Sequence, residues 1–203
     1  MSHRIVLGLV LALGGVASAS AQVCEVAALI GEARSGGSAL KTGSGLKVGD
    51  EVQTAAKSRM RLRCVDGSSL VLGESSQLRI EAFDAQGSQR NEARFFLRLG
   101  LVGQKVSAGG AWTLRTPSAV TAVRGTEFVV DVQGEEKTAV LMQSGSVEVQ
   151  PSRTQTRSIA AALPLIALAG LMGTDCQFGK GCSPAAVWSE KRVKATLDRL
   201  SGV

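Results

Sequence analysis

Side chains that could perform catalysis near neutral pH are few in this sequence. Its only histidine is His3, and it contains no tyrosine. We expect the segment around His3 to be removed, so the mature protein would have no imidazole. Ser-His-Asp and Cys-His nucleophile systems depend on a histidine that moves protons, and His-containing zinc sites need it as a ligand. We therefore predict no catalytic residue, no cofactor and no metal site.

Paired carboxylates are the remaining route to hydrolysis, because glycoside cleavage uses two of them. Asp66 with Glu74, or Glu135 with Glu136, could form such a pair. The second pair follows Gly134 at an expected hairpin tip, where exposure to solvent explains it. Aromatic residues make up only 3% of the chain, so a sugar-stacking cleft is poorly supplied. A carboxylate-based glycan hydrolase is therefore the least favoured hypothesis.

Four cysteines form an even set: Cys24, Cys64, Cys176 and Cys182. A zinc site made of cysteines alone would have to gather four distant sulfurs, so disulfides are the better interpretation in an oxidising compartment. Cys24 and Cys64 share the inward phase of their strands, and we expect them to pair; buried free thiols are the alternative. Cys176 and Cys182 enclose a loop with two glycines and should pair locally.

Residues 1–21 have the features of a secretory signal peptide. Arg4 supplies a positive charge, residues 5–17 are apolar, and Ala19-Ser20-Ala21 is a cleavage site of the A-x-A type. The apolar run is shorter than the roughly 20 residues of a membrane span, so an uncleaved anchor is the weaker alternative. We therefore expect a periplasmic or secreted protein.

The formal net charge of +6 is carried by single Lys and Arg residues and not by a block. Such scatter is typical of a solvated surface. We expect no nucleic acid as a partner of an exported protein. An envelope protein or polymer is the expected partner, with a weak preference for anionic groups.

Short alternating runs, separated by Gly, Asp-Gly or Ser-rich turns, predict β-strands from Cys24 to Gln150. The clearest strand is 59–65, in which apolar residues take one face and three arginines the other. Two later strands should each line the core with one face, through Phe95, Leu97, Leu99 and Leu101, and through Phe128, Val130 and Val132. This alternation predicts an all-β domain of stacked antiparallel sheets over residues 22–150.

The composition changes after Pro151. Residues 151–158 are a polar linker, and residues 159–174 form an uncharged apolar segment that contains Pro164. Three interpretations of this segment are open: a helix docked on the β domain, a surface-attached membrane segment, or a membrane anchor. Docking or surface attachment is favoured over spanning, because the segment is at the lower limit for a span.

Residues 175–203 are expected to hold the disulfide loop and a short C-terminal helix. Ser183-Pro184 offers an N-cap followed by a proline in the first helical position, so the helix should run to about Leu200. A narrow apolar stripe predicts that this helix packs against the β domain, through Val193, Leu197 and Leu200.

Several stretches resemble the FecR domain, a periplasmic module of iron-uptake sensors and of many secreted proteins. They are 30–33, 46–54, 66–73, 99–102, 116–119 and the most specific one, 123–128. The resemblance implies a β-helix-like or sandwich-like module that mediates protein contacts, without known catalysis. Regulatory members carry a cytoplasmic sigma-factor-binding segment before a membrane span. Only a signal peptide is expected here, so we do not expect direct control of a sigma factor.

The motif residues also have physical roles. Gly49-Asp50 and Asp66-Gly67 are turn dipeptides. Thr116-Pro117 should end a strand, because proline cannot donate to a β-ladder. Arg124-Gly125-Thr126 interrupts two apolar runs. We expect the Arg124 guanidinium to bridge carbonyls or a carboxylate such as Asp50 or Asp66, a structural role that we favour over ligand contact.

Two functional hypotheses follow. The first is a non-enzymatic periplasmic or secreted FecR-domain module that mediates protein or envelope contacts, with signalling as one role. The alternative is a structural envelope protein that is attached to the membrane through residues 159–174.

Overall fold

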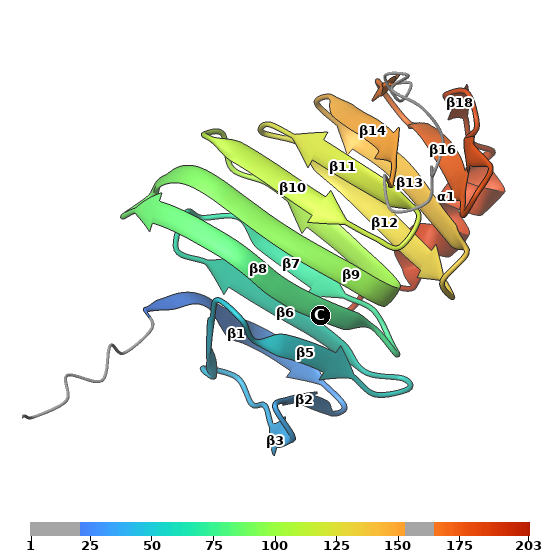
Figure 1. Cartoon of the computed structure of the whole chain (residues 1–203). Coiled ribbons are helices and arrows are strands. Elements are labelled where there is room, and N and C mark those ends of the chain that lie inside the picture. Colours follow the sequence, from blue (N-terminus) through green and yellow to red (C-terminus); the bar gives the residue numbers. More distant parts are fainter. Residues whose placement is uncertain (1–20, 153–164) are drawn as a thin grey trace, which may run out of the picture.

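The computed structural model of the protein describes residues 21–152 and 165–203 and shows two β-sheets stacked face to face (Figure 1). The predicted all-β fold of stacked sheets is confirmed. The predicted signal peptide, apart from Ala21, and most of the predicted linker lie outside the described residues.

Sheet A is antiparallel throughout, with the strand order β4-β1-β6-β7-β9-β12-β13-β16. The short strands β17 and β18 both pair with β16 at one edge. The bounds are β1 (Gln22–Ile30), β4 (Gly45–Lys47), β6 (Arg59–Cys64), β7 (Ser69–Leu72), β9 (Gln89–Lys105), β12 (Glu127–Gln133), β13 (Lys137–Ser144), β16 (Met172–Gln177), β17 (Gly181–Cys182) and β18 (Ala186–Val187).

Sheet B has the order β3-β2-β5-β8-β9-β10-β11-β14-β15 and is antiparallel except for the parallel pair β9/β10. Its further strands are β2 (Ala33–Ser35), β3 (Ser38–Ala39), β5 (Glu51–Thr54), β8 (Gln77–Gln86), β10 (Ala111–Arg115), β11 (Ala119–Val123), β14 (Val147–Pro151) and β15 (Ile166–Leu168).

Strand β9 belongs to both sheets and bends at Gly100. Residues up to Leu99 pair with β8 in sheet B, whereas residues 100–105 pair with β12 in sheet A. Gly100 has φ +92°, and a Cβ there would come within 2.5 Å of the Cα of Ser76. Only glycine fits both the left-handed backbone and the close approach of the Ser76 main chain.

The core lies between the two sheets and follows the predicted alternation on most strands. On β6, Met60, Leu62 and Cys64 are buried and the arginines between them point outward. One prediction was wrong: Leu101 does not share a side with Phe95 and Leu97, which lie in the main core. Leu101 lies on the outer face of sheet A, because the bend at Gly100 shifts the inward phase of β9 to Val102.

Helix α1 (Glu190–Asp198) covers part of the outer face of sheet A. Its predicted apolar stripe packs as expected, with Val193, Leu197 and Leu200 against a buried cluster of Leu101, Val129, Leu141 and Trp188. The predicted start was wrong, because Ser189 is the N-cap. The Ser183 hydroxyl lies within hydrogen-bond distance of Thr174 and accepts from the Asp175 amide, and residues 186–187 form β18.

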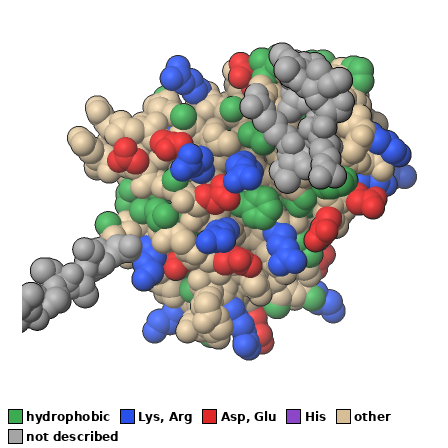
Figure 2. Space-filling model, viewed as in Figure 1, with side chains coloured by type: hydrophobic (Ala, Val, Ile, Leu, Met, Phe, Trp, Pro, Cys, Tyr) green, Lys and Arg blue, Asp and Glu red, His purple; other side chains and the backbone are tan. Residues whose placement is uncertain are grey.

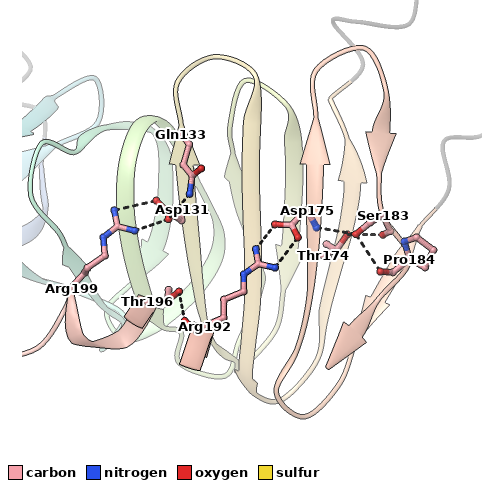
Figure 3. A network of polar contacts seen from close by, with 9 residues as sticks. All are labelled: Asp131, Gln133, Thr174, Asp175, Ser183, Pro184, Arg192, Thr196 and Arg199. Carbon is pink, nitrogen blue, oxygen red and sulfur yellow. Dashed lines mark hydrogen bonds and ion pairs between the residues drawn. The ribbon is translucent and has the colours of Figure 1, made fainter. Parts of the chain in front are cut away.

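Two ion pairs fix α1 to sheet A (Figure 3). Arg192 binds both carboxylate oxygens of Asp175, at 2.9 and 2.5 Å, and its guanidinium lies 3.4 Å from the ring centre of Trp188. Arg199 donates to Asp131 at 2.6 Å. Because Asp131 is buried at 7% exposure, this second pair is the less solvent-screened of the two.

The described part of the apolar segment is extended and not helical. Residues 166–168 form β15 on β14, and β16 begins at Met172 and pairs with β13. Leu168 is buried in the main core. The expectation of a docked helix is therefore wrong for residues 165–174, and the rest of the segment lies outside the described residues. Within the described ranges, no helix is long and apolar enough to cross a membrane.

The two expected disulfides are present. Cys24 and Cys64 face each other on β1 and β6, and Cys176 and Cys182 face each other on β16 and β17. The described chain has no free cysteine.

We expect Gly100→Ala to lower the free energy of unfolding by about 3 kcal/mol, because the methyl group would overlap the Ser76 main chain in a left-handed backbone. Gly87→Ala is the matched control: Gly87 also has positive φ, but beyond its chain neighbours no atom lies within 4 Å of the position that a Cβ would take. The control should cost about 1 kcal/mol. Urea unfolding checks both values, and equal losses would show that the approach of Ser76 is not limiting.

We expect removal of the Cys24–Cys64 bond by a double alanine substitution to cost about 4 kcal/mol, and removal of Cys176–Cys182 about 2 kcal/mol. The first bond closes a separation of 40 residues and the second one of 6, so the first restricts the unfolded chain more. Urea unfolding of the oxidised variants measures the difference. A larger loss for the second pair would contradict the chain-entropy explanation.

Candidate interaction surface

Asp66 of the Asp66-Gly67 motif lies in a buried ion pair. Its carboxylate binds the Arg90 guanidinium, with both side chains 1% exposed or less, and accepts from the amide and hydroxyl of Ser68 at 3.0 and 2.8 Å. Arg90 also donates to the carbonyls of Ser107 and Gly110 at 3.1 and 2.9 Å. The carboxylate thus has charged and neutral donors around it, which suits a structural role.

An aromatic ring completes this buried group. The guanidinium of Arg90 lies 5.1 Å from the ring centre of Trp112, and the Trp112 Nε1 donates to Gln104 Oε1 at 2.7 Å. Arg90 was not singled out from the sequence. In the sequence, Arg90 is out of step with the alternation of Ala93 and Phe95. All three residues are buried in the structure because the register between β8 and β9 is irregular.

The other motif residues close turns and strand ends. The Asp50 carboxylate accepts from the Lys47 amide at 2.9 Å, and Gly49 beside it has φ +96°. The Thr116 hydroxyl, just after β10, lies 2.8 Å from that of Thr138 on β13. Thr126 Oγ1 lies 2.9 Å from the Ser146 carbonyl.

The carboxylates considered for glycan hydrolysis either have structural partners or lie exposed in a turn. Asp66 is held by Arg90, and Glu74 accepts from the Lys57 amide at 3.0 Å. Glu135 and Glu136 are exposed in the turn between β12 and β13, as expected. In the described ranges, no group of three or more His, Cys, Asp or Glu residues could hold a metal ion.

The outer face of sheet B carries arginines around Phe96. In register across the sheet lie Arg79 on β8, Phe96 on β9, Arg115 on β10 and Val120 on β11. Arg115 donates to both carboxylate oxygens of Glu81 at 3.1 Å and lies 5.8 Å from the Phe96 ring centre. Figure 2 shows this face, with basic and acidic side chains interleaved around hydrophobic ones.

Two exposed arginines of this face, Arg79 and Arg98, make no ion pair with any described residue. Arginine and aromatic side chains are enriched at protein interfaces, where a guanidinium can bind a carboxylate or stack on a ring. We therefore define the candidate interaction surface as the outer face of β8, β9, β10, β11 and β14.

Arg124 lines a shallow hollow of about 350 Å³ in this surface. Small side chains of Ala111, Thr113 and Ala122 contribute to its lining, and Glu148 on β14 lies there with Arg124. The predicted bridge from Arg124 to Asp50 or Asp66 was wrong, because Arg90 occupies Asp66 and Arg124 is exposed. Arg124 lines the hollow instead.

The hollow in this surface is small for a small-molecule site. Its volume is near the lower end of the range of ligand pockets. A flat sheet face with a partly buried ring and unpaired guanidinium groups instead resembles the centre of a protein interface.

Comparisons with known proteins agree with this architecture. Residues 50–148 match the family described as FecR protein. Two crystal structures of a candidate anti-sigma factor from Parabacteroides distasonis, at 1.65 and 2.50 Å resolution, share the fold, with TM-scores of 0.57 and 0.56 and 18% identity. The alignments cover 72% of this chain and 64% and 63% of those chains. No curated protein matches the sequence.

We expect Asp66→Ala to lower the free energy of unfolding by about 3–5 kcal/mol, because it leaves the buried Arg90 guanidinium without a counter-charge. Glu81→Ala breaks the exposed pair with Arg115 and should cost less than about 1 kcal/mol. Urea unfolding compares the two.

The double variant Asp66→Leu with Arg90→Met separates the charge effect from packing. It should be more stable than Asp66→Ala, since it removes both charges at once. A double variant that is less stable than Asp66→Ala would show that hydrogen bonds, and not charge pairing, dominate.

Proposed function

We propose that the protein is a non-enzymatic, signalling-related module that binds a protein partner outside the cytosol, because residues 50–148 match the FecR family. The match to the FecR family supports a signalling-related role. Two disulfides are consistent with an extracytoplasmic or envelope location, since such bonds persist in oxidising compartments.

The single observation that carries this proposal is the candidate interaction surface on sheet B. It places the exposed guanidinium groups of Arg79 and Arg98 next to the half-buried Phe96 on a sheet face that α1 does not cover. A partner side chain can stack on the ring while its carboxylates bind the guanidinium groups. Such a combination gives both affinity and orientation.

Arg124, which belongs to the stretch 123–128 of the FecR resemblance, lies in the same surface. Residues 123–128 end β11 and begin β12, and Gly125 and Thr126 turn the chain so that Arg124 lines the hollow. The Thr126 hydroxyl lies within 3.0 Å of the carbonyls of Arg124 and Ser146, which fixes this turn to the residue just before β14. A contact role for Arg124 is therefore part of the proposal.

Site-specific photo-crosslinking in the producing cell tests the proposal. A photoreactive amino acid at Ala122, which is exposed in the hollow, should give a discrete adduct with one protein. The same amino acid at Glu135, exposed on the distant β12/β13 turn, should not. Equal crosslinking from both positions, or an adduct only from Glu135, would contradict the assignment of the surface.

Affinity for the crosslinked protein then measures the contributions. Phe96→Ala should weaken binding by about 2 kcal/mol, or roughly 30-fold in Kd, as expected for an aromatic anchor. Arg98→Glu should also weaken it, whereas Lys180→Glu, an exposed charge change on the β16/β17 turn, should not. Unchanged affinity in both surface variants would argue against this face.

A further inference from the structure

A second hollow lies on the opposite side of the sandwich, on the outer face of sheet A beside α1. It has a volume of about 420 Å³ and lies between β6, β7 and β9 and the C-terminal end of the helix. We call it the β6–α1 groove. The residues that matter are Arg61, Arg63, Val71, Lys105, Glu127 and Leu197.

The groove is basic, and two of its cations form no ion pair, although Arg63 faces Glu25 on β1 and Lys105 faces Glu127 on β12. Arg63 and Lys105 are exposed, and neither forms an ion pair or a side-chain hydrogen bond with a described residue. The carboxylate in the lining is Glu127, which faces Lys105 across the β9/β12 pair without forming an ion pair. The groove therefore offers positive charge to an outside ligand.

The neighbouring arginines, Arg59 and Arg61, instead donate hydrogen bonds to main-chain carbonyls of the C-terminal segment. Arg59 Nε donates to the Arg199 carbonyl at 2.8 Å, and Arg61 donates to the carbonyl of Val203. These bonds hold the end of α1 against sheet A, where Leu200 packs over Gly103; a Cβ on Gly103 would come within 2.7 Å of the Leu200 Cδ1. One wall of the groove is thereby fixed in place.

The pairing of β6, β7 and β9 sets the distance between Arg63 and Lys105. Arg63 on β6 faces Ser69 on β7, and Ser69 faces Lys105 on β9. Since neighbouring strands are about 4.8 Å apart, the two cationic residues are about 10 Å apart. In an extended peptide of polyproline II conformation, with three residues per turn and a rise of about 3.1 Å per residue, carboxylates three positions apart lie on the same side at a similar separation of about 9 Å.

We propose that the β6–α1 groove binds an extended acidic segment of a protein, with one carboxylate on Arg63, a second on Lys105, and an apolar side chain over Val71 and Leu197. The lining supports each part, because Arg63 can bind a carboxylate in a bidentate manner and the half-buried Val71 and Leu197 offer an apolar floor. Glu127 disfavours a continuous polyanion, and the recess beside the helix disfavours a flat lipid surface. The groove is independent of the surface on sheet B.

Fluorescence anisotropy with the full exported chain tests this proposal. The probe is a labelled eight-residue peptide with two glutamates three positions apart and a leucine between them. We expect Arg63→Gln with Lys105→Gln to weaken binding about ten-fold or more at low salt, since hydrogen bonds to charged groups are lost. The matched control is Lys41→Gln with Lys180→Gln, which also removes two exposed positive charges, lies outside both surfaces and should leave Kd unchanged.

The outcomes separate the proposal from its competitors. A peptide with two adjacent glutamates should bind more weakly, and equal binding would overturn the proposal, because the cations would not act as a spaced pair. Loss of binding in the control variant alone, or no binding by the wild type, would also overturn it. So would cosedimentation with phosphatidylglycerol vesicles that depends on Arg63 and Lys105 in the absence of peptide binding. All four substituted positions are exposed, so circular dichroism should show unchanged folding.

Discussion

The passage of β9 from sheet B to sheet A at Gly100 is the constraint on which the rest of the structure depends. Because one strand is central to both sheets, the two layers cannot shift relative to each other without breaking pairs with β8, β10, β7 or β12. The close approach of Ser76 at the bend excludes a side chain there. The bend also moves Leu101 to the outside of sheet A, where it becomes part of the apolar patch that α1 covers.

The buried pair of Asp66 and Arg90 fixes the same strand near its other end. Asp66 follows β6, and Arg90 begins β9, so the pair connects the turn between β6 and β7 to the strand that links the sheets. Replacing both partners of a buried ion pair by apolar side chains often changes the free energy of unfolding little. Removing only one partner leaves a buried charge and is strongly destabilising. This explains how a motif that is typical of a simple Asp-Gly turn carries a structural carboxylate.

The two outer faces of the sandwich differ in what they offer a partner. Sheet B presents Phe96 with arginines and the hollow at Arg124, whereas sheet A is partly covered by α1 and leaves a basic groove beside it. The helix is held by ion pairs at Asp131 and Asp175 and by apolar contacts under Leu197 and Leu200. The chain thus has two surfaces of different chemistry on opposite layers.

The sequence alone determined the β architecture, the phase of most strands, both disulfides and the apolar stripe of the helix, because each depends on local periodicity or on the chemistry of few residue types. It did not determine that Arg90, and not Arg124, neutralises Asp66, or that residues 166–168 and 172–177 form strands. Those outcomes depend on which segments become neighbours across the sheets, and in the Arg90 case on irregular register between β8 and β9. The interaction surface and the groove were likewise decided by the tertiary structure, since their residues come from strands far apart in the chain and meet only through pairing.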